Sequence, residues 1–315
     1  MVDRAVKGAG DPRVALVVLT HERRALVCRQ VERALALPER PPIYAVDNGS
    51  RDGTARALAR FGPRVRVLRS ERNLGAAGRN LGAAAAEARY VAFADDDTWY
   101  APGALARAAD HLDADPGVAV VSGCVLVRGR PDPACLAMAR SVLGEEGGRV
   151  AVVGFLAGAC VVRRAAFLEA GGYEPRLFLG AEESLLALDL LAAGWRLAYC
   201  ADVRVHHEPA PRDAGARRAR LRRNEVKVAW LRRPLRRAFP ISLAAWRRCE
   251  SRGERARLAL DLARSLPWLL RARRLVPPAV EARVRAVEAS AGAAARAAAA
   301  HPGTTLAGAV DGGTR

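Results

Sequence analysis

The stretch YVAFADDDTW, residues 90–99, places an apolar run directly before three acidic side chains. Its first five residues are predicted to form a short buried strand. Asp95, Asp96 and Asp97 cannot all lie unpaired in a core, because burying an unpaired carboxylate is very costly. Alternate side chains of a strand share a face, so Asp95 and Asp97 can present two carboxylates to one divalent cation. The stretch therefore predicts a Mg²⁺ or Mn²⁺ site that bridges to a substrate diphosphate, with a solvated loop start or a helix cap as the alternative.

Strand patterns alternate with helical patterns along the first half of the chain. Strands are predicted at 14–19, 43–46, 65–68, 90–94 and 118–127, and helices at 26–37, 54–61 and 102–111. Such alternation predicts βαβ units and a parallel sheet, in which ligands bind at the carboxyl ends of the strands. Thr20, Asp47 and Asp95 stand at three of these ends. We therefore expect them to meet in one crevice.

The second half of the chain is less regular. Residues 128–150 are rich in Gly, Pro and charge, and we expect a long loop there. Further elements are predicted as helices at 163–170 and 184–193 and short strands at 196–200 and 203–205.

Composition divides the chain into four parts. Residues 1–12 are expected to be a loose leader, and 13–210 to be an α/β domain. Residues 211–284 are Arg-rich and predicted to be a helical extension, and 285–315 are Ala- and Gly-rich and predicted to be a disordered tail.

The net charge is concentrated in the extension. The 315-residue chain carries a formal charge of +18, and between Arg212 and Arg274 there are 20 Lys and Arg against 5 Asp and Glu, or +15. The six cysteines form no CxxC pair, which favours reduced thiols and a cytoplasmic location. We also expect no signal peptide and no membrane span, because the N-terminus lacks an apolar run and no window is apolar enough.

Three ordered motifs resemble those of family 2 glycosyltransferases. They are VDNGSRDGT at 46–54, NLGAAGRN at 73–80 and the strand that ends in the acidic triplet. The later GGY at 171–173, the acidic pair at 182–183 and His206 also fit, so the resemblance spans about residues 13–210. It implies a GT-A fold, which is α/β and Rossmann-like with a mostly parallel central sheet flanked by helices. It also implies a nucleotide-sugar donor, a divalent metal and inversion at the anomeric carbon.

The resemblance assigns a nucleoside site to the first two strand ends. Thr20 and Asp47 take the positions that hold the nucleoside, and Glu22 and Asn48 beside them join the candidate nucleotide-sugar site. A carboxylate can accept a hydrogen bond from a pyrimidine N3–H. Without the resemblance, a helix cap at Thr20 and an Asx turn at Asp47 and Asn48 are the simpler interpretations.

Residues 73–80 are expected to hold the diphosphate. Asn73 and Gly75 lie near a helix start, whose N–H groups attract anions, and Arg79 adds a cation that faces the donor in the family pattern. A helix N-terminus with a packing glycine is the structural alternative.

The resemblance also assigns the metal ligands. Asp97 is implied as the direct ligand, with Asp95 contacting ribose or metal through water, and Asp96 has the weakest case for a role in donor binding. His206 matches a position that completes the metal shell, and imidazole suits Mn²⁺. The adjacent His207 is the less favoured candidate.

The acidic pair Glu182-Glu183 stands where the family has Glu-Asp ahead of a helix. Glu183 therefore falls on the position of the general base, one methylene longer than the usual Asp. Asp189 replaces the usual Arg on the same helix, which leaves the acceptor side open. Without the resemblance, acidic residues at a helix N-terminus need only the macrodipole as explanation.

The Arg-rich extension admits three interpretations. Arginines interleaved with Trp and Leu at 212–274 can lie on an anionic membrane, bind the phosphate of a lipid-linked acceptor, or form a solvated face. Nucleic acid is not expected as a partner, because no nucleic-acid-binding module is present.

The sequence thus predicts a glycosyltransferase that moves a sugar from a UDP- or dTDP-linked donor to a glycan or lipid-linked acceptor in cell-envelope synthesis. The expected location is cytoplasmic or peripheral at the inner face of the plasma membrane. The alternatives are a sugar nucleotidyltransferase, which lacks support because no Gly-rich loop follows residue 20, and a decayed GT-A scaffold anchored by its basic tail.

Overall fold

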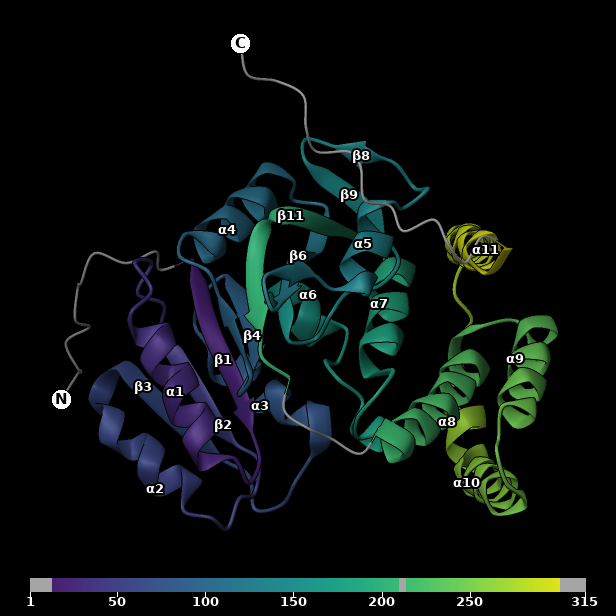
Figure 1. The fold of residues 1–315 in the computed structure, drawn as a ribbon, viewed down its shortest axis with the longest axis horizontal. Coiled ribbons are helices and arrows are strands. Elements are labelled where there is room, and N and C mark those ends of the chain that lie inside the picture. Colours follow the sequence, from purple (N-terminus) through teal and green to yellow (C-terminus); the bar gives the residue numbers. More distant parts are fainter. Residues whose placement is uncertain (1–12, 210–213, 301–315) are drawn as a thin grey trace.

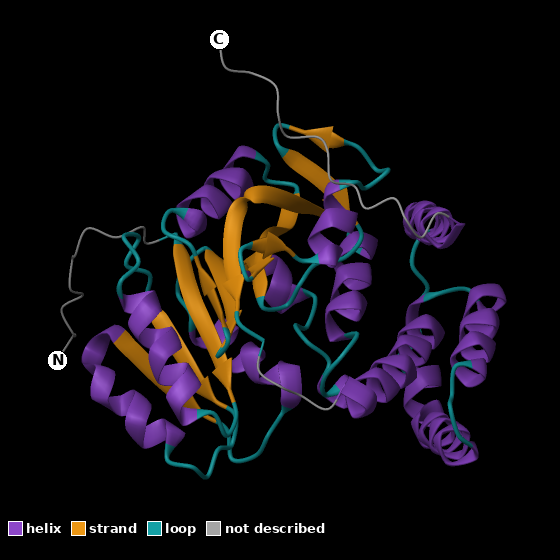
Figure 2. Cartoon of the chain, in the orientation of Figure 1, coloured by secondary structure: helices purple, strands orange, loops and turns teal. Residues whose placement is uncertain are grey.

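Helices flank one mixed sheet in the computed structural model, which describes residues 13–209 and 214–300 (Figure 1, Figure 2). The predicted leader 1–12 lies outside the described residues, and so does the junction at 210–213 between the predicted domain and its extension. The boundaries of these parts therefore stay predictions.

The strands are β1 (Val14–Thr20), β2 (Ile43–Asp47), β3 (Val65–Arg69), β4 (Tyr90–Asp95), β5 (Thr98–Tyr100), β6 (Val118–Val127), β7 (Arg130–Pro131), β8 (Glu145–Glu146), β9 (Arg149–Val152), β10 (Ala159–Arg163) and β11 (Arg196–His207). The α-helices are α1 (Arg24–Leu35), α2 (Thr54–Leu58), α3 (Gly78–Ala85), α4 (Ala104–Ala114), α5 (Pro133–Ala139), α6 (Arg164–Glu169), α7 (Glu182–Ala192), α8 (Ala214–Arg232), α9 (Leu235–Arg247), α10 (Arg252–Arg271) and α11 (Pro278–Ala300). Short 3₁₀ helices are η1 (Ala59–Arg64), η2 (Gly75–Ala77) and η3 (Pro175–Leu177).

The sheet has the order β3-β2-β1-β4-β10-β6-β11-β9-β8, with β5 paired to β11 and β7 to β6. Strands β3, β2, β1 and β4 are parallel neighbours, and β6 and β11 run in the same direction. Strand β10 lies antiparallel between β4 and β6. The predicted α/β class with a mostly parallel central sheet is therefore confirmed.

The register brings the predicted polar strand ends together. Thr20 of β1 lies opposite Asp47 of β2, and Leu19 lies opposite Asp95 of β4. The strands are buried on both faces up to these ends, since β1 and β2 are almost entirely inaccessible. The apolar parts of the strands thus lie in the core, and their carboxyl ends lie together at one edge of the sheet, where they form the crevice.

Glycines on α3 let this helix lie close to the first strand. A Cβ at Gly82 would come within 2.4 Å of the Val17 side chain, and one at Gly78 within 2.6 Å of Leu19. The GxxxG spacing of these residues puts both on one face of the helix. The close packing fixes where α3 begins, and therefore where Arg79 lies.

Three expectations for the second half were wrong. The loop predicted for 128–150 contains β7, α5 and β8, and α5 begins where the Asp132 side chain accepts from the Ala134 N–H at 2.8 Å and Pro133 takes the first turn. The two short strands predicted within 196–205 form one strand, β11, whose pairing with β6 shifts register between Cys200 and Arg204.

The tail predicted to be disordered from 285 is helical up to Ala300 in α11. Its first part packs on the main core, because Val280 and Val284 are 7% and 8% exposed and lie one helical turn apart. The Ala-rich composition was taken for low complexity, although alanine is also the strongest helix former. Residues 301–315 lie outside the described part of the chain.

The helical extension shares the core of the sheet. Helices α8–α11 lie on the far side of α5 and α7 from β1–β3 (Figure 1). Val228 and Leu231 of α8 and Leu269 of α10 belong to the same buried cluster as the strands, and a smaller cluster joins α8, α9 and α10 around Val226 and Leu258.

Candidate active site

The acidic triplet divides among three environments at the end of β4. The Asp96 carboxylate accepts from Thr20 Oγ1 at 2.9 Å and from Arg23 at 2.9 Å. The same Arg23 guanidinium reaches Asp97 at 3.2 Å, and the Asp97 side chain is only 1% exposed. Burial raises the pKa of Asp96, while Arg23 and Thr20 lower it. Asp96 and Asp97 thus form a buried pair held by Arg23, not a solvated loop start.

Asp95 is the most exposed of the three acidic residues and pairs with Arg79. The Arg79 guanidinium is 3% exposed and donates from Nη2 to Asp95. Among the described residues, Arg79 Nε and Nη1 have no hydrogen-bond partner. Burial is the largest influence and acts against its charge, but Asp95, Tyr173, Glu182 and Cys160 together outweigh burial and raise the pKa of Arg79. A buried cation with unused N–H groups is suited to an anionic ligand.

Asp47 is fully buried at the end of β2 and half satisfied. Its Oδ1 accepts from the Ser50 N–H at 2.9 Å, three residues on rather than the two of the predicted Asx turn. Its Oδ2 has no hydrogen-bond partner among the described residues, and Arg69 Nε lies 3.7 Å away. The structural and the functional interpretation therefore use different oxygens of one carboxylate, and Oδ2 is the atom that could accept a ligand N–H.

The side chain of Asn48 joins two loops. Its Nδ2 donates to Asn73 Oδ1 at 3.0 Å and to the Gly75 carbonyl at 2.9 Å, and its Oδ1 accepts from the Leu74 N–H. Asn73 Oδ1 also accepts from the Gly75 N–H at 2.8 Å. These contacts use the amide of Asn48 within the protein, so it positions the 73–75 loop.

Gly75 is required by close approach as well as by conformation. Its φ is +62°, and a Cβ there would lie 1.9 Å from the Phe178 carbonyl oxygen. The next N–H, that of Ala76, donates to this same oxygen at 2.6 Å. The loop at residues 73–76, the candidate diphosphate site, is thereby hydrogen-bonded to the segment that leads into α7.

Thr20 and Glu22 hold the loop after β1. Glu22 has a positive φ of 53°, its N–H donates to Ser50 Oγ, and its carboxylate accepts from the Arg51 N–H at 2.7 Å. These bonds link the first two strand ends directly. Thr20 and Glu22 therefore lie at the strand end that borders the crevice, and their hydrogen bonds are with other residues of the protein.

The two histidines at the end of β11 face different neighbours. His206 stacks on Trp99 with ring centroids 5.4 Å apart, and Arg33 covers Trp99 at 3.6 Å. His207 Nε2 lies 3.7 Å from Asp97 Oδ1. The geometry thus favours His207 over the predicted His206 as the imidazole next to the acidic cluster, since side chains alternate along the strand.

The acidic pair forms the first turn of α7, after Ala181 at a positive φ of 66°. Glu182 is 4% exposed, and Glu183 is partly exposed. Burial, and then the charge of Glu183, raise the pKa of Glu182 to about 8. One oxygen of each, Oε2, is buried without a hydrogen-bond partner among the described residues.

Elements far apart in the sequence carry this pair to the crevice. Arg79 lowers the pKa of Glu182, and Arg79, Glu183 and Asp95 all act on the pKa of the buried Cys160 thiol, which burial raises to about 12. From α8, the Asn224 amide donates to the carbonyls of Leu177, Leu179 and Gly180 just before α7. The extension therefore helps to position the first turn of α7.

Asp189, where the family pattern has Arg, is a structural residue. Its carboxylate accepts two bonds from Arg232 of α8, that between Nη2 and Oδ2 at 3.0 Å. A departure from the motif on α7 is thus matched by a basic partner in the extension. The Asp189–Arg232 ion pair joins α7 to α8.

Two contributors to the crevice were missed by sequence reasoning. Arg23 bridges Asp96 and Asp97, and its place three residues after β1 was the available signal. Asn80 exchanges two hydrogen bonds of 2.9 Å with the backbone of Tyr173, and so joins the two quoted motifs 73–80 and 171–173. No periodicity in the sequence indicates that pairing.

Asp95, Asp97 and His207 are of the residue types that ligate a divalent cation, but they are not a group of described residues whose ligand atoms all lie within 4.8 Å of one another. Asp95 and Asp97 provide carboxylate oxygens at one strand end, and His207 provides an imidazole beside Asp97. Carboxylate and imidazole suit Mn²⁺, and carboxylate suits Mg²⁺. A second group, His111, Cys200 and Asp202, has ligand atoms within 4.8 Å of one another but lies outside this crevice, between α4 and β11.

Comparison with known families decides between the candidate classes. The family model of glycosyl transferase family 2 matches residues 15–144, and that of glycosyl transferase family group 2 matches residues 90–272, more than half of the chain. The chain belongs to glycosyltransferase family 2. It is therefore a glycosyltransferase, and the interpretation as a sugar nucleotidyltransferase is wrong.

Two curated relatives of this glycosyltransferase act in glycan synthesis by name. The N-acetylglucosaminyl-diphospho-decaprenol L-rhamnosyltransferase of Mycobacterium tuberculosis is 31% identical over 212 residues, covering 55% of this chain and 68% of the relative. The succinoglycan biosynthesis protein ExoO of Rhizobium meliloti is 35% identical over 106 residues, covering 33% and 30%. Cell-envelope glycan synthesis fits both.

Solved structures show the same GT-A fold at low identity. The mannosyltransferase PcManGT from Pyrobaculum calidifontis, in complex with GDP-Man and Mn²⁺, has a TM-score of 0.54 at 22% identity and covers 91% of this chain and 90% of its own. S. aureus TarS 1-349 in complex with UDP-GlcNAc has a TM-score of 0.56 at 16% identity, covering 81% and 71%.

Proposed function

We propose that this glycosyltransferase transfers a sugar from a UDP- or dTDP-linked donor to a hydroxyl of a lipid-linked acceptor, with inversion at the anomeric carbon. Three groups of unsatisfied polar atoms support this proposal. They are Asp47 Oδ2, the Arg79 N–H groups and the Glu182 and Glu183 carboxyl oxygens. In this order they suit a pyrimidine, a diphosphate and an acceptor hydroxyl.

The single observation that carries the proposal is the burial of Arg79. A cation that is 3% exposed and has two unused nitrogen donors is costly unless an anion completes it. The donor diphosphate is such an anion, and Arg79 lies in the first turn of α3, whose N-terminal N–H groups attract the same charge.

In the proposed step, the acceptor oxygen attacks the anomeric carbon from the face opposite the diphosphate. The new C–O bond forms as the bond from carbon to the diphosphate oxygen breaks, and the hydroxyl proton passes to the Glu183 carboxylate. Glu183 is partly exposed and can meet an acceptor, whereas Glu182 is buried with a pKa of about 8 and is protonated at neutral pH. Arg79 carries part of the charge of the departing nucleoside diphosphate.

Asp97, Asp95 and His207 are the residues that we assign to a divalent cation. When bound, Mn²⁺ or Mg²⁺ supplies positive charge to the leaving diphosphate. Thr20 and Arg23 hold Asp96, which orients the triplet. His206 keeps a positioning role through its stack on Trp99.

The extension supplies a surface that suits a membrane. On α9, Leu235, Phe239, Leu243 and Trp246 are 48%, 57%, 49% and 41% exposed, and their spacing puts them on one face, the outer face of α9. Exposed arginines flank this face, a combination that binds anionic lipid. No helix in 13–209 or 214–300 is long and apolar enough to cross a bilayer. Double substitution of Phe239 and Leu243 by Ser should reduce sedimentation with anionic vesicles, and unchanged sedimentation would contradict this role.

Ligand-dependent thermal stability tests the proposed donor site. UDP, dTDP and GDP are added separately, with and without Mn²⁺, because ligands that bind the folded state raise the Tm. We expect a metal-dependent rise with UDP or dTDP and a smaller one with GDP, since Asp47 Oδ2 is placed to accept a pyrimidine N3–H. If no nucleotide shifts the Tm, the chain is better described as a scaffold with a decayed site.

A further inference from the structure

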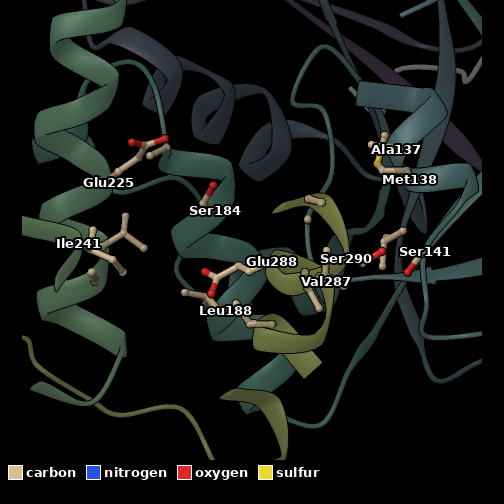
Figure 3. A pocket seen from close by; sticks show the side chains of 18 of the residues that line it. Ala137, Met138, Ser141, Ser184, Leu188, Glu225, Ile241, Val287, Glu288 and Ser290 are labelled. Atoms are coloured by element: carbon tan, nitrogen blue, oxygen red, sulfur yellow. The ribbon is translucent and has the colours of Figure 1, made fainter. Parts of the chain in front are cut away.

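A cavity of about 840 Å³ lies between the catalytic core and the helical extension. Its walls come from α5, α7, α8, α9 and α11, and Figure 3 shows Leu188, Ile241 and Val287 around the space from three of these helices. The volume is in the range of about 300–1,000 Å³ that is usual for small-molecule pockets. Most of the lining side chains are apolar, and each of the five helices contributes at least one Val, Leu, Ile, Ala or Met.

One end of the cavity touches the first turn of α7. Ala181 and Ser184 belong to its wall, and these residues flank the acidic pair Glu182-Glu183 in the sequence. A molecule in the cavity therefore lies against the turn of α7 that also carries Glu183, the residue to which we assign the acceptor proton, although Glu183 itself does not line the cavity. This continuity connects the cavity to the acceptor side of the reaction.

Charged groups also line the cavity. Arg140 and Arg248 line it at the C-terminal ends of α5 and α9, and Arg222 of α8, which is paired with Glu254, lies on the same wall as Glu225. The acidic Glu288 is bound to Arg233 and Arg237, and burial raises the pKa of Glu225 while Arg248 and Arg222 lower it. An occupant that joins an apolar chain to an anionic group matches this arrangement.

Helix α9 separates the cavity from the outer surface. Ile241, Ala244 and Arg248 face the cavity, whereas Phe239 and Leu243 lie on the outer face. The 3.6-residue period places these two sets on opposite sides of the helix. A lipid chain drawn from a membrane at the outer face would have to pass only one helix to reach the cavity.

We propose that this cavity holds the isoprenoid chain of a diphosphate-linked acceptor, with Arg140 and Arg248, which line the cavity, next to the diphosphate. The assignment rests on the proposed sugar transfer, because Glu183 gives the cavity its relation to an acceptor. It is specific in its occupant: an unbranched fatty acid or a protein segment does not combine an apolar chain with a diphosphate.

Farnesyl diphosphate binding, measured by calorimetry in EDTA, tests the proposal without the metal site. We expect one site per chain, and geranyl diphosphate should bind at least about tenfold more weakly because five buried carbons are lost. Palmitate and inorganic pyrophosphate should bind much more weakly than farnesyl diphosphate. Absence of farnesyl diphosphate binding, or equal binding of palmitate, overturns the proposal.

Tryptophan substitutions locate the site. Ala244→Trp and Ala137→Trp fill the cavity from opposite walls, and Ala259→Trp makes the same change on an exposed part of α10. We expect the first two to weaken farnesyl diphosphate binding at least tenfold and the third to leave it unchanged. Equal binding by all three variants overturns the location. If a variant fails to fold, a benzophenone-tagged farnesyl diphosphate on the native chain must label peptides within 133–142, 241–248 or 284–291, and labelling elsewhere contradicts the proposal.

The nucleotide-induced Tm shift with Mn²⁺, measured on the same variants, separates the two proposals. A normal nucleotide shift without farnesyl diphosphate binding rejects only the cavity assignment. Farnesyl diphosphate binding that Ala244→Trp abolishes, in a chain without any nucleotide shift, upholds the cavity and rejects the proposed donor site.

Discussion

The crevice and the helical extension both bury arginines and carboxylates, but they satisfy them differently. In the extension, Arg232 is bound by both oxygens of Asp189, and Arg233 by Glu281 and Glu288, although Arg237 Nε and Arg273 Nη1 also lack hydrogen-bond partners among the described residues. In the crevice, Arg79 and the pair Glu182-Glu183 retain buried polar atoms without hydrogen-bond partners among the described residues. Buried charges that are fully paired hold elements together, whereas buried charges that are only partly paired are suited to a ligand.

The same comparison accounts for much of the basic character of the extension. Arg222 pairs with Glu254, and Lys227 and Arg223 pair with Asp261. These residues connect α8 to α10 and are not available to a membrane. Anionic lipid would therefore contact the exposed arginines beside the apolar face of α9.

The largest expected effect is on the crevice. Asp97→Ala should abolish metal-dependent nucleotide binding and reduce transfer roughly a thousandfold or more, because the leaving diphosphate loses its cation. The fold should remain, as judged by circular dichroism. Asp132→Asn, at the exposed start of α5, is the control and should retain activity. Unchanged nucleotide affinity in Asp97→Ala would reject the metal assignment.

The next effect separates binding from chemistry. Glu183→Gln keeps the shape of the side chain but cannot take a proton, so transfer should fall by about 10²–10⁴-fold with normal UDP or dTDP affinity. Rapid quench with saturating donor measures the loss. If Glu183→Gln retains transfer and Glu182→Gln loses it, the two roles are reversed.

In the extension the expected loss is in stability. Arg233→Ala leaves the buried Glu281 carboxylate with only Arg237 Nε, 3.8 Å away, and should lower the free energy of unfolding by up to about 3–5 kcal/mol. Arg236→Ala, on the exposed side of α9, should change it by less than about 0.5 kcal/mol. Urea denaturation of both variants checks this, and equal stabilities would show that the buried pair is not structural.

The smallest effect concerns pH. The pKa of Glu182 is raised by burial to about 8 in the folded chain, against an ordinary value near 4.5. The folded state keeps a proton that the unfolded state loses, so this group lowers stability as pH rises from about 4.5 to about 8. Glu182→Gln should remove that loss. Parallel stability curves of both proteins from pH 5 to 8.5 would contradict the shift.

The sequence predicted the parts of the fold that depend on local pattern. The strands ending at Thr20, Asp47 and Asp95 were found because apolar runs and polar ends are neighbours in the sequence, and their meeting follows from parallel pairing. Helix α5 was missed because Pro133 was taken as a loop residue, although it suits a helix start after Asp132. Helix α11 was missed because Val280 and Val284 are buried through tertiary packing, with α11 lying against α7.

The sequence predicted which residues lie at the site better than it predicted what each of them does there. Asn48, Asn73 and Glu22 were expected at the nucleotide, and the structure has them hydrogen-bonded to neighbouring loops. Arg23 and the choice between His206 and His207 depend on tertiary contacts with Asp97, which no pattern encodes. Asp189, which in the sequence left the acceptor side open, forms an ion pair with Arg232 of α8.

One paired measurement tests the comparison most directly: the Tm and the affinity for UDP or dTDP with Mn²⁺ in Arg79→Met and in Arg232→Met. Both variants replace a buried guanidinium by an apolar chain of similar length. The account predicts that Arg79→Met loses nucleotide affinity at nearly the native Tm, and that Arg232→Met loses Tm and keeps its affinity. The reverse pattern, or an equal loss of both properties in both variants, would contradict it.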